Sequence, residues 1–177
     1  KNGPCTFRDW NSANASPLKL DEEKYQLCLS HDKLVIKALE TIKYFREKNN
    51  SLQYCIENPR ALLCRRPYMR AFVEDLKNDC MVLERDHCAY STNSARKRTH
   101  FFTNSKTLQT DLGTTGTGVC DNGKNCGATV FYENGKRRHK HTFAIGQSPK
   151  DRLRGTDCRV RIASIPKQLI DIFVSEK

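Results

Sequence analysis

The sequence contains no apolar run that approaches the roughly 18 residues needed to span a membrane, so no segment is expected to cross a bilayer. It shows neither a signal-peptide pattern nor an internal repeat. Its first residue is Lys rather than Met, and we expect the chain to begin inside a longer or processed protein. Its 177 residues, 37% hydrophobic and 29% charged, suffice for one soluble domain with a core or for half of a larger one.

The dense, regular cysteine spacing of a secreted disulfide scaffold is also missing. Nine cysteines, an odd number, are spread from Cys5 to Cys158. The sequence therefore predicts mostly reduced thiols and an intracellular protein. Two N-x-S sequons, at Asn14 and Asn49, leave a secreted, disulfide-linked protein as an alternative that would need paired cysteines and glycosylation.

Positive charge is in excess and is unevenly distributed along the chain, with a formal net charge of +11. Residues 1–92 hold 15 Lys and Arg against 13 Asp and Glu, a net +2, whereas residues 93–177 hold 16 against 7, a net +9. A basic half beside a near-neutral half favours a polyanionic partner, most commonly nucleic acid. A well-solvated basic surface without a partner explains the charge equally well.

In the first part of the chain, hydrophobic periodicity predicts helices that alternate with strands. The expected helices cover residues 31–48 and 67–78. The expected strands lie within 51–56, 80–88 and 99–103. The first strand should end in a turn at Asn58-Pro59. This alternation indicates an α/β sheet with crossover helices, in which ligands bind beyond the carboxyl ends of strands, where Glu57 falls.

After Asn104 the composition changes, and residues 105–125 are rich in Thr, Gly and Asn. The strand-like "ATVFY" meets an Asn134-Gly135 turn and is followed by "KRRHKHTFAIG", which predicts a β-hairpin. The closing "IPKQLIDIFV" predicts a terminal helix with Pro166 in its first turn.

Cys5 and Glu57 are the candidate catalytic residues. Cys5 follows Gly-Pro in an expected loop, where a thiol can face a cleft and act as a nucleophile if a neighbour activates it. The alternative is a small buried hydrophobic residue. Glu57 ends an apolar strand in "IENP", where a carboxyl group suits proton donation or a hydrogen bond to a heteroatom. The alternative is a surface turn that contains a glutamate.

Arginines form a second group of candidates. Arg96 and Arg98 alternate in "SARKRTHFFTN", so their side chains should point to one side of an extended segment and suit phosphate or carbonyl acceptors. An exposed basic strand end is the alternative. The densest basic patch, "KRRHKH", makes Arg137, Arg138 and Lys140 candidates for nucleic-acid binding.

A zinc site is a further hypothesis, because thiolates and imidazoles are the ligands that zinc prefers. Its candidate ligands are Cys120, Cys126, His139 and His141, although their C-x5-C spacing is looser than the usual C-x2-4-C.

In chain order, "GPC", an amphipathic helix, "IENP", "ARKRTHFFTN" and "IPKQLIDIF" resemble the carboxyl-terminal half of DNA cytosine-5 methyltransferases, and most of all the compact forms of phages and large DNA viruses. The resemblance covers about residues 3–104 and returns at the end. It implies a partial Rossmann-like methyltransferase sheet in a catalytic segment, 1–104. A basic region, 105–160, would stand in place of the DNA-reading segment, and a helix in 161–177 would return to the α/β domain.

The resemblance also implies a role for each candidate. Cys5 would attack C6 of cytosine, Glu57 would contact N3 and the exocyclic amine, and Arg98 with Arg96 would hold the base carbonyl and a phosphate. S-adenosylmethionine would donate the methyl group, and the target base would leave the DNA helix first. Compact members carry Cys and His in the region that corresponds to 105–160, which agrees with the zinc hypothesis.

The sequence departs from the family pattern at three points. Gly3 replaces the first proline of Pro-Pro-Cys, and Ser94 replaces a glutamine. The family's glycine-rich cofactor loop has no counterpart, since "GTTGTG" does not lie between a strand and a helix. We therefore expect a fragment, or one chain of a split enzyme whose amino-terminal partner binds the cofactor. RNA is a variant of the DNA substrate, and the rival hypothesis is a non-catalytic nucleic-acid-binding module.

Overall fold

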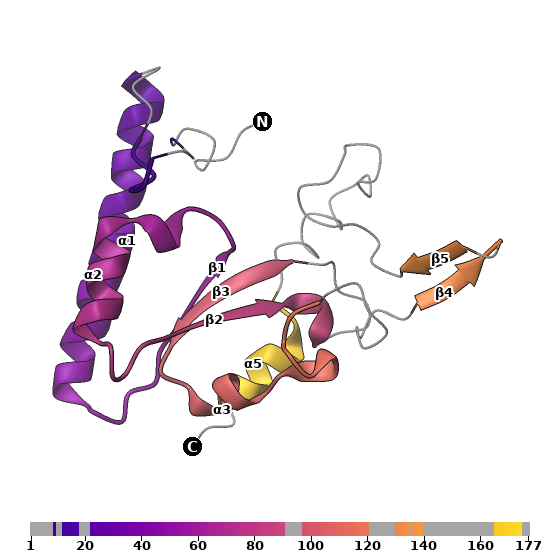
Figure 1. The fold of residues 1–177 in the computed structure, drawn as a ribbon. Coiled ribbons are helices and arrows are strands. Elements are labelled where there is room, and N and C mark those ends of the chain that lie inside the picture. The colour runs from indigo at the N-terminus through magenta and orange to yellow at the C-terminus, as the bar shows by residue number, and fades with distance from the viewer. Residues whose placement is uncertain are drawn as a thin grey trace. The chain divides into compact units, whose positions relative to one another are not determined.

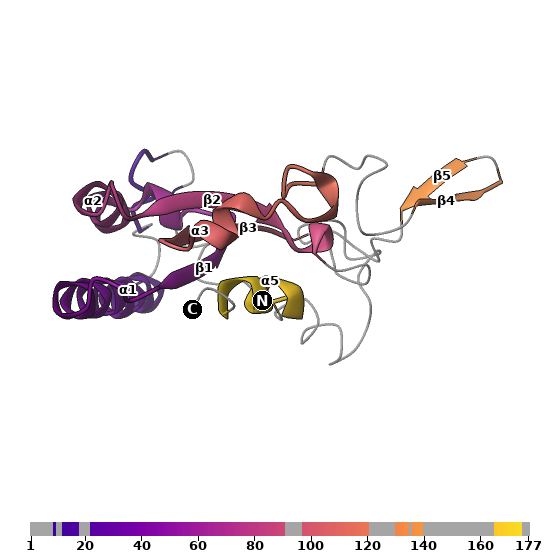
Figure 2. The same ribbon diagram turned by 90° about the horizontal axis from the view of Figure 1, so that it is seen from below.

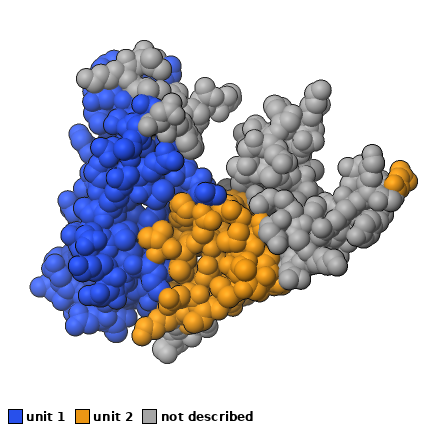
Figure 3. Space-filling model, in the orientation of Figure 1, with its two compact units in different colours: residues 1–81, 102–104 blue, residues 82–101, 105–177 orange. Residues whose placement is uncertain are grey.

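The computed structural model describes residues 9, 12–17, 22–90, 97–120, 130–134, 136–139 and 165–174. These residues form a mixed α/β fold, which confirms the predicted α/β class (Figure 1). The chain divides into two compact units, coloured separately in Figure 3. The first comprises residues 1–81 and 102–104, and the second comprises residues 82–101 and 105–177.

Three strands form a small antiparallel sheet. They are β1 (Cys55–Pro59), β2 (Met81–Asp86) and β3 (Arg98–Thr103), in the order β1-β3-β2 (Figure 1). Because neighbouring strands are antiparallel, β1 and β2 run in the same direction, and both end at the edge where β3 begins. Helix α2 (Pro67–Asp75) therefore connects two strands of the same direction, as the predicted crossover helix should.

Strand β1 begins later than predicted and continues through Glu57 to Pro59, where the sequence suggested a turn. Residues 52–54 do not pair as a strand because two side chains at the end of β3 bind their backbone instead. Thr103 is the last residue of β3, and Asn104 follows it. Asn104 accepts from the Tyr54 backbone N–H at 2.9 Å and donates to the Leu52 carbonyl at 2.9 Å. Thr103 Oγ1 donates to the Tyr54 carbonyl at 2.6 Å. Side chains thus replace the ladder that residues 51–54 were expected to form.

The first unit buries its core between α1 (Glu22–Lys48) and α2, which pack alongside each other in both ribbon views (Figures 1 and 2). Its fully or nearly buried members are Leu39, Tyr54, Met69, Phe72, Cys80 and Phe102. The rings of Tyr54 and Phe72 meet edge to face, with centroids 5.9 Å apart. Lys43 of α1 forms an ion pair with Asp75 of α2 on the exposed side of this contact.

Helix α1 begins at Glu22, well before the predicted start near His31. Two acidic residues occupy its first turn, where they stabilise the positive end of the helix dipole. Cys28 in this extension is fully buried. Hydrophobic periodicity did not predict this extension because few of its apolar side chains are buried. Helix α2 begins at Pro67, as predicted, and ends slightly earlier, at Asp75.

The second unit contains several short elements besides its parts of β2 and β3. They are η3 (His87–Ala89), α3 (Lys106–Thr110), η4 (Gly113–Thr115), β4 (Val130–Glu133), β5 (Lys136–His139) and α5 (Lys167–Val174); η2 (Leu63–Arg65) belongs to the first unit. Ser105 caps α3 by accepting from the Leu108 N–H at 3.0 Å. At five residues, α3 is too short to produce a periodic signal in the sequence.

The predicted hairpin and terminal helix are both present. Strands β4 and β5 pair antiparallel, with Val130 opposite His139 and Glu133 opposite Lys136. Asn134 adopts a positive φ of 51°, as the turn requires. Helix α5 starts directly after Pro166 and packs against α3. In the part of the chain that the structure describes, no helix is both long enough and apolar enough to span a membrane.

Candidate functional site

The described residues include only part of the predicted site. Glu57 is the third residue of β1 and Arg98 is the first of β3. For Arg137, Arg138 and His139 the structure describes only the backbone, in β5. The remaining candidates lie outside the described residues; they are Cys5, Arg96, Cys126, Lys140 and His141.

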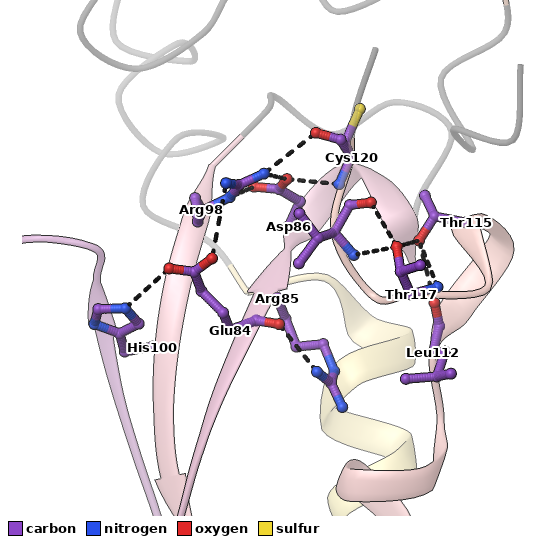
Figure 4. A network of polar contacts seen from close by, with 10 residues as sticks. Glu84, Arg85, Asp86, Arg98, His100, Leu112, Thr115, Thr117 and Cys120 are labelled. Atoms are coloured by element: carbon purple, nitrogen blue, oxygen red, sulfur yellow. Dashed lines mark hydrogen bonds and ion pairs between the residues drawn. The ribbon is translucent and has the colours of Figure 1, made fainter. Parts of the chain in front are cut away.

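Arg98 is held at the start of β3 by a buried carboxylate (Figure 4). Its Nη2 donates to Asp86 Oδ2 at 2.9 Å, and its Nε lies 3.4 Å from Asp86 Oδ1. Nη2 also donates to the Cys120 carbonyl at 3.2 Å. The bond to Asp86 raises the pKa of Arg98, more than burial lowers it. The guanidinium therefore remains charged and fixed in orientation.

Asp86 is fully buried, and its surroundings show what makes this burial possible. Besides Arg98, Asp86 Oδ2 accepts from the Cys120 backbone N–H at 2.7 Å. The Asp86 backbone N–H donates to the Gly118 carbonyl at 2.8 Å. A buried carboxylate is tolerated when a cation and further donors surround it. Asp86 thus joins the end of β2, the start of β3 and the segment before Cys120.

The same network extends to Glu84 and His100 (Figure 4). Glu84 Oε1 lies 3.2 Å from His100 Nε2, and Glu84 Oε2 lies 3.7 Å from Arg98 Nη1. The second distance is an ion pair without a hydrogen bond. Nη1 is therefore the guanidinium nitrogen with donors suited to a ligand carbonyl or phosphate oxygen, and a quarter of the Arg98 side chain reaches solvent.

Glu57 shares one face of β1 with Cys55, because side chains alternate along a strand. Ile56, between them, points the other way and packs against the core of the first unit. The pKa of the Cys55 thiol is raised to about 11, chiefly by burial and to a smaller extent by the charge of Glu57, against a hydrogen bond with Thr103 that lowers it. Cys55 is the thiol next to the candidate acid, but these influences keep it protonated and unreactive.

Of the predicted zinc ligands, Cys120 is the one whose side chain the structure describes, and it is fully buried against Cys88. Among the described residues no three His, Cys, Asp or Glu side chains converge as a metal site would require. The donors present therefore do not make up a zinc site, and a set completed by Cys126, His139 and His141 stays a prediction.

The glycine-rich segment after α3 does not form a cofactor cradle. A side chain added to Gly113, at φ +57°, would meet the Ala89 carbonyl oxygen at 2.5 Å. One added to Gly118, at φ +72°, would meet the Arg85 side chain at 2.5 Å. At both positions, the missing side chain leaves room for atoms of the protein itself rather than for a ligand. Arg85 in turn donates to the Leu108 carbonyl at 2.9 Å. The residues of this segment do not fit S-adenosylmethionine.

A cavity of about 580 Å³ lies within the second unit, and no sequence pattern predicted it. It is lined by Ala89, Tyr90, Asp111, Gly113, Thr114, Gln168, Asp171 and Ile172. Tyr90 donates to the Asp111 carbonyl at 3.0 Å, and burial raises the pKa of Tyr90 to about 12. The lining comes from three separate elements, so no local motif announces it.

Sequence reasoning also missed Asp86, the central acid of the network. A signal was available, because "VLERD" places charged residues at the end of an apolar strand, as "IENP" does for Glu57. The same argument applied to β2 would have identified it.

Comparisons of the chain with protein-family models, with curated proteins and with solved structures gave no match.

Replacing Asp86 with Ala should destabilise the protein by about 3 kcal/mol, the low end for a broken buried pair, because Arg98 keeps part of its side chain in solvent. The measurement is urea unfolding followed by circular dichroism. Glu84→Gln removes a carboxylate of the same network that is more exposed and should cost below about 1 kcal/mol. Equal losses in the two variants would contradict the central role of Asp86.

Cys55 should react slowly with iodoacetamide at pH 8.5, about 10- to 100-fold slower in the folded chain than in urea, because its raised pKa leaves little thiolate. The folded-state rate should keep rising through pH 10, whereas the unfolded-state rate levels off above the ordinary thiol pKa. Mass spectrometry of the modified peptide measures both rates. A folded-state rate that levels off near pH 9 would show limited access rather than a raised pKa.

Proposed function

We propose that this chain is the base-handling, carboxyl-terminal segment of a DNA cytosine-5 methyltransferase, built on a partial Rossmann-like sheet. In this proposal the chain acts together with an amino-terminal segment, in a longer or a split enzyme, that binds S-adenosylmethionine. The active groups of this chain are Cys5, Glu57 and Arg98, with Arg96 beside them.

The order of the sheet is the observation that carries the proposal. β1 and β2 run in one direction with α2 between them in sequence, and β3 runs oppositely between them in the sheet. Glu57 lies near the end of β1 and Arg98 at the start of β3. An antiparallel neighbour begins where its partner ends, so we expect the end of β1 and the start of β3 to lie at one edge of the sheet. That edge is the one where ligands bind in open α/β sheets.

The chemistry of cytosine explains why such groups are needed together. C5 of cytosine is a poor nucleophile until something adds at C6. The Cys5 thiolate adds there, and the electrons of the C5–C6 bond move into the ring toward N3. Glu57, hydrogen-bonded at N3, offsets that charge, while Arg98 and Arg96 hold the carbonyl oxygen and a phosphate.

S-adenosylmethionine supplies the methyl group when bound to the amino-terminal segment. The described residues of this chain form no cradle for it, so the steps assigned here end with activation of the base.

Covalent trapping tests the nucleophile directly. We expect the chain, together with the amino-terminal partner from the same source and S-adenosylmethionine, to form an adduct with duplex DNA that carries 5-fluorocytosine. Fluorine at C5 cannot leave as a proton does, so the sulfur stays attached. Mass spectrometry should locate the adduct on Cys5.

Two variants sharpen this experiment. Cys5→Ala should abolish the adduct, whereas Cys64→Ala, which removes a half-buried thiol of η2 that donates to the Ala61 carbonyl, should leave it intact. Tight DNA binding without any adduct would overturn the methyltransferase proposal and favour a binding module. An adduct on RNA but not on DNA would reassign the substrate.

A non-catalytic nucleic-acid-binding module is the second candidate, and the hairpin register favours it. The β4–β5 ladder sets Phe131 opposite Arg138 and Tyr132 opposite Arg137. A two-stranded ribbon of this kind fits the major groove, and arginine with aromatic residues suits phosphates and bases. This property is compatible with the methyltransferase proposal, in which the same ribbon would hold the DNA.

Replacing Arg137 and Arg138 together with Ala should weaken DNA binding and reduce the slope of log K against log salt by about 2, because two phosphate contacts are lost. Fluorescence anisotropy at several salt concentrations measures the slope. The matched control is Lys33→Ala with Lys77→Ala, which removes the same charge from exposed positions of the first unit. An equal change in slope for the control would show a general charge effect and contradict a hairpin contact.

A further inference from the structure

Helix α1 carries two apolar stripes, and only one of them faces the core of the first unit. The inner stripe packs into that core through residues such as Leu39 and Ile42. The outer stripe contains Leu27, Leu34 and Phe45, which are 43%, 70% and 52% exposed. A helix at the surface of a globular unit needs only the inner stripe. The outer stripe is therefore a candidate contact surface.

The outer stripe follows the heptad spacing of helices that pack as a coiled coil. We call its six members the outer seam: Leu27, His31, Leu34, Ala38, Thr41 and Phe45. Successive members are separated by alternating steps of four and three residues, the spacing that keeps one line of a helix facing a partner helix. His31 is half-buried, and the other five members are exposed.

The outer seam is complementary to itself. Its steps, four-three-four-three-four, read the same from either end. A second α1 that runs antiparallel, related by a two-fold axis at the level of residue 36, therefore places every seam residue opposite another. The facing pairs are Leu27 with Phe45, Leu34 with Ala38, and His31 with Thr41. Apolar side chains thus meet apolar ones, the large Leu34 meets the small Ala38, and the two polar residues meet each other.

Charge at the two ends of α1 selects the antiparallel direction. The first turn contains Glu22 and Glu23, and the last turn contains Arg46 and Lys48. One residue of opposite charge in each turn still leaves the two ends net negative and net positive. In an antiparallel pair, each acidic turn lies beside the basic turn of the other copy, and the two helix dipoles are opposed. A parallel pair would bring like charges together at both ends.

We propose that the outer seam is the interface of a homodimer, in which α1 of one copy packs antiparallel against α1 of a second copy. Lys37 lies close to the two-fold axis, and its ion pair with Glu40 at 3.3 Å offsets part of the repulsion between its two copies. The seam covers about 27 Å of helix, from Leu27 to Phe45, which makes a small interface. We therefore expect a dissociation constant between about 1 and 100 µM.

Sedimentation equilibrium of the full chain, from about 1 to 300 µM, should show a reversible monomer–dimer equilibrium. Leu34→Lys should raise the dissociation constant at least about 10-fold, because each dimer loses two buried leucines. The matched control is Ile36→Lys, which adds the same charge to the same helix about 180° away from Leu27. Ile36 is 37% exposed, and this variant should stay within about threefold of the wild type.

Circular dichroism of both variants checks that the helix is intact. If Leu34→Lys loses helical signal, Leu27→Lys takes its place, because it alters the same seam near one end of the helix.

Cross-linking tests the direction of packing separately. Lys24 and Lys48 lie about 36 Å apart along α1, both within one copy and between parallel copies. In the antiparallel register, Lys24 of one copy lies beside Lys48 of the other. A lysine-reactive cross-linker much shorter than that distance should join the two residues in the wild type and in Ile36→Lys. Peptide mass spectrometry should find much less of this product in Leu34→Lys.

A chain that stays monomeric at the highest concentration would overturn the proposal and leave the outer seam for a different partner. A dimer that Leu34→Lys does not weaken, or that both variants weaken equally, would place the contact on another surface and overturn it as well. A dimer that yields no product between Lys24 and Lys48 would contradict the antiparallel register.

Discussion

The buried ion pair between Asp86 and Arg98 is the interaction on which the candidate site depends. A carboxylate with no exposed surface must find its donors within the protein, and Asp86 finds them in Arg98 and in the Cys120 backbone. Meeting that requirement aligns the end of β2 with the start of β3. It also determines the orientation of the guanidinium, because two of its nitrogens face Asp86 and the third, Nη1, forms an ion pair with Glu84.

The first unit meets a similar constraint in a similar way. Asp32, also buried, pairs with Arg66, and Arg66 bonds the carbonyls of an irregular turn. In both places, an arginine links a buried carboxylate to backbone carbonyls that lie outside the helices and strands. Arginine suits this task because its five donors point in fixed directions within one plane. Each pair therefore holds an irregular segment of backbone in place.

The methyltransferase proposal draws its support from where charged residues lie in the sheet. Glu57 and Arg98 belong to strands that end and begin at one edge, and Cys55, the thiol beside Glu57, is kept protonated by burial. In the proposal, the nucleophile is therefore a different thiol, that of Cys5. In the proposal, the β4–β5 hairpin, which carries Arg137 and Arg138, would bind the nucleic-acid backbone.

By itself the sequence determined the features that depend on near neighbours in the chain. These include helix α2 with Pro67 at its start, the Asn134 turn between β4 and β5, and the terminal helix after Pro166. Only the tertiary structure decided the strand order, the early start of α1, the side chains that displace the ladder before β1, and the partners of Asp86 and Asp32. Local periodicity and turn chemistry act over a few residues, whereas a buried charge takes its partner from wherever the fold brings one.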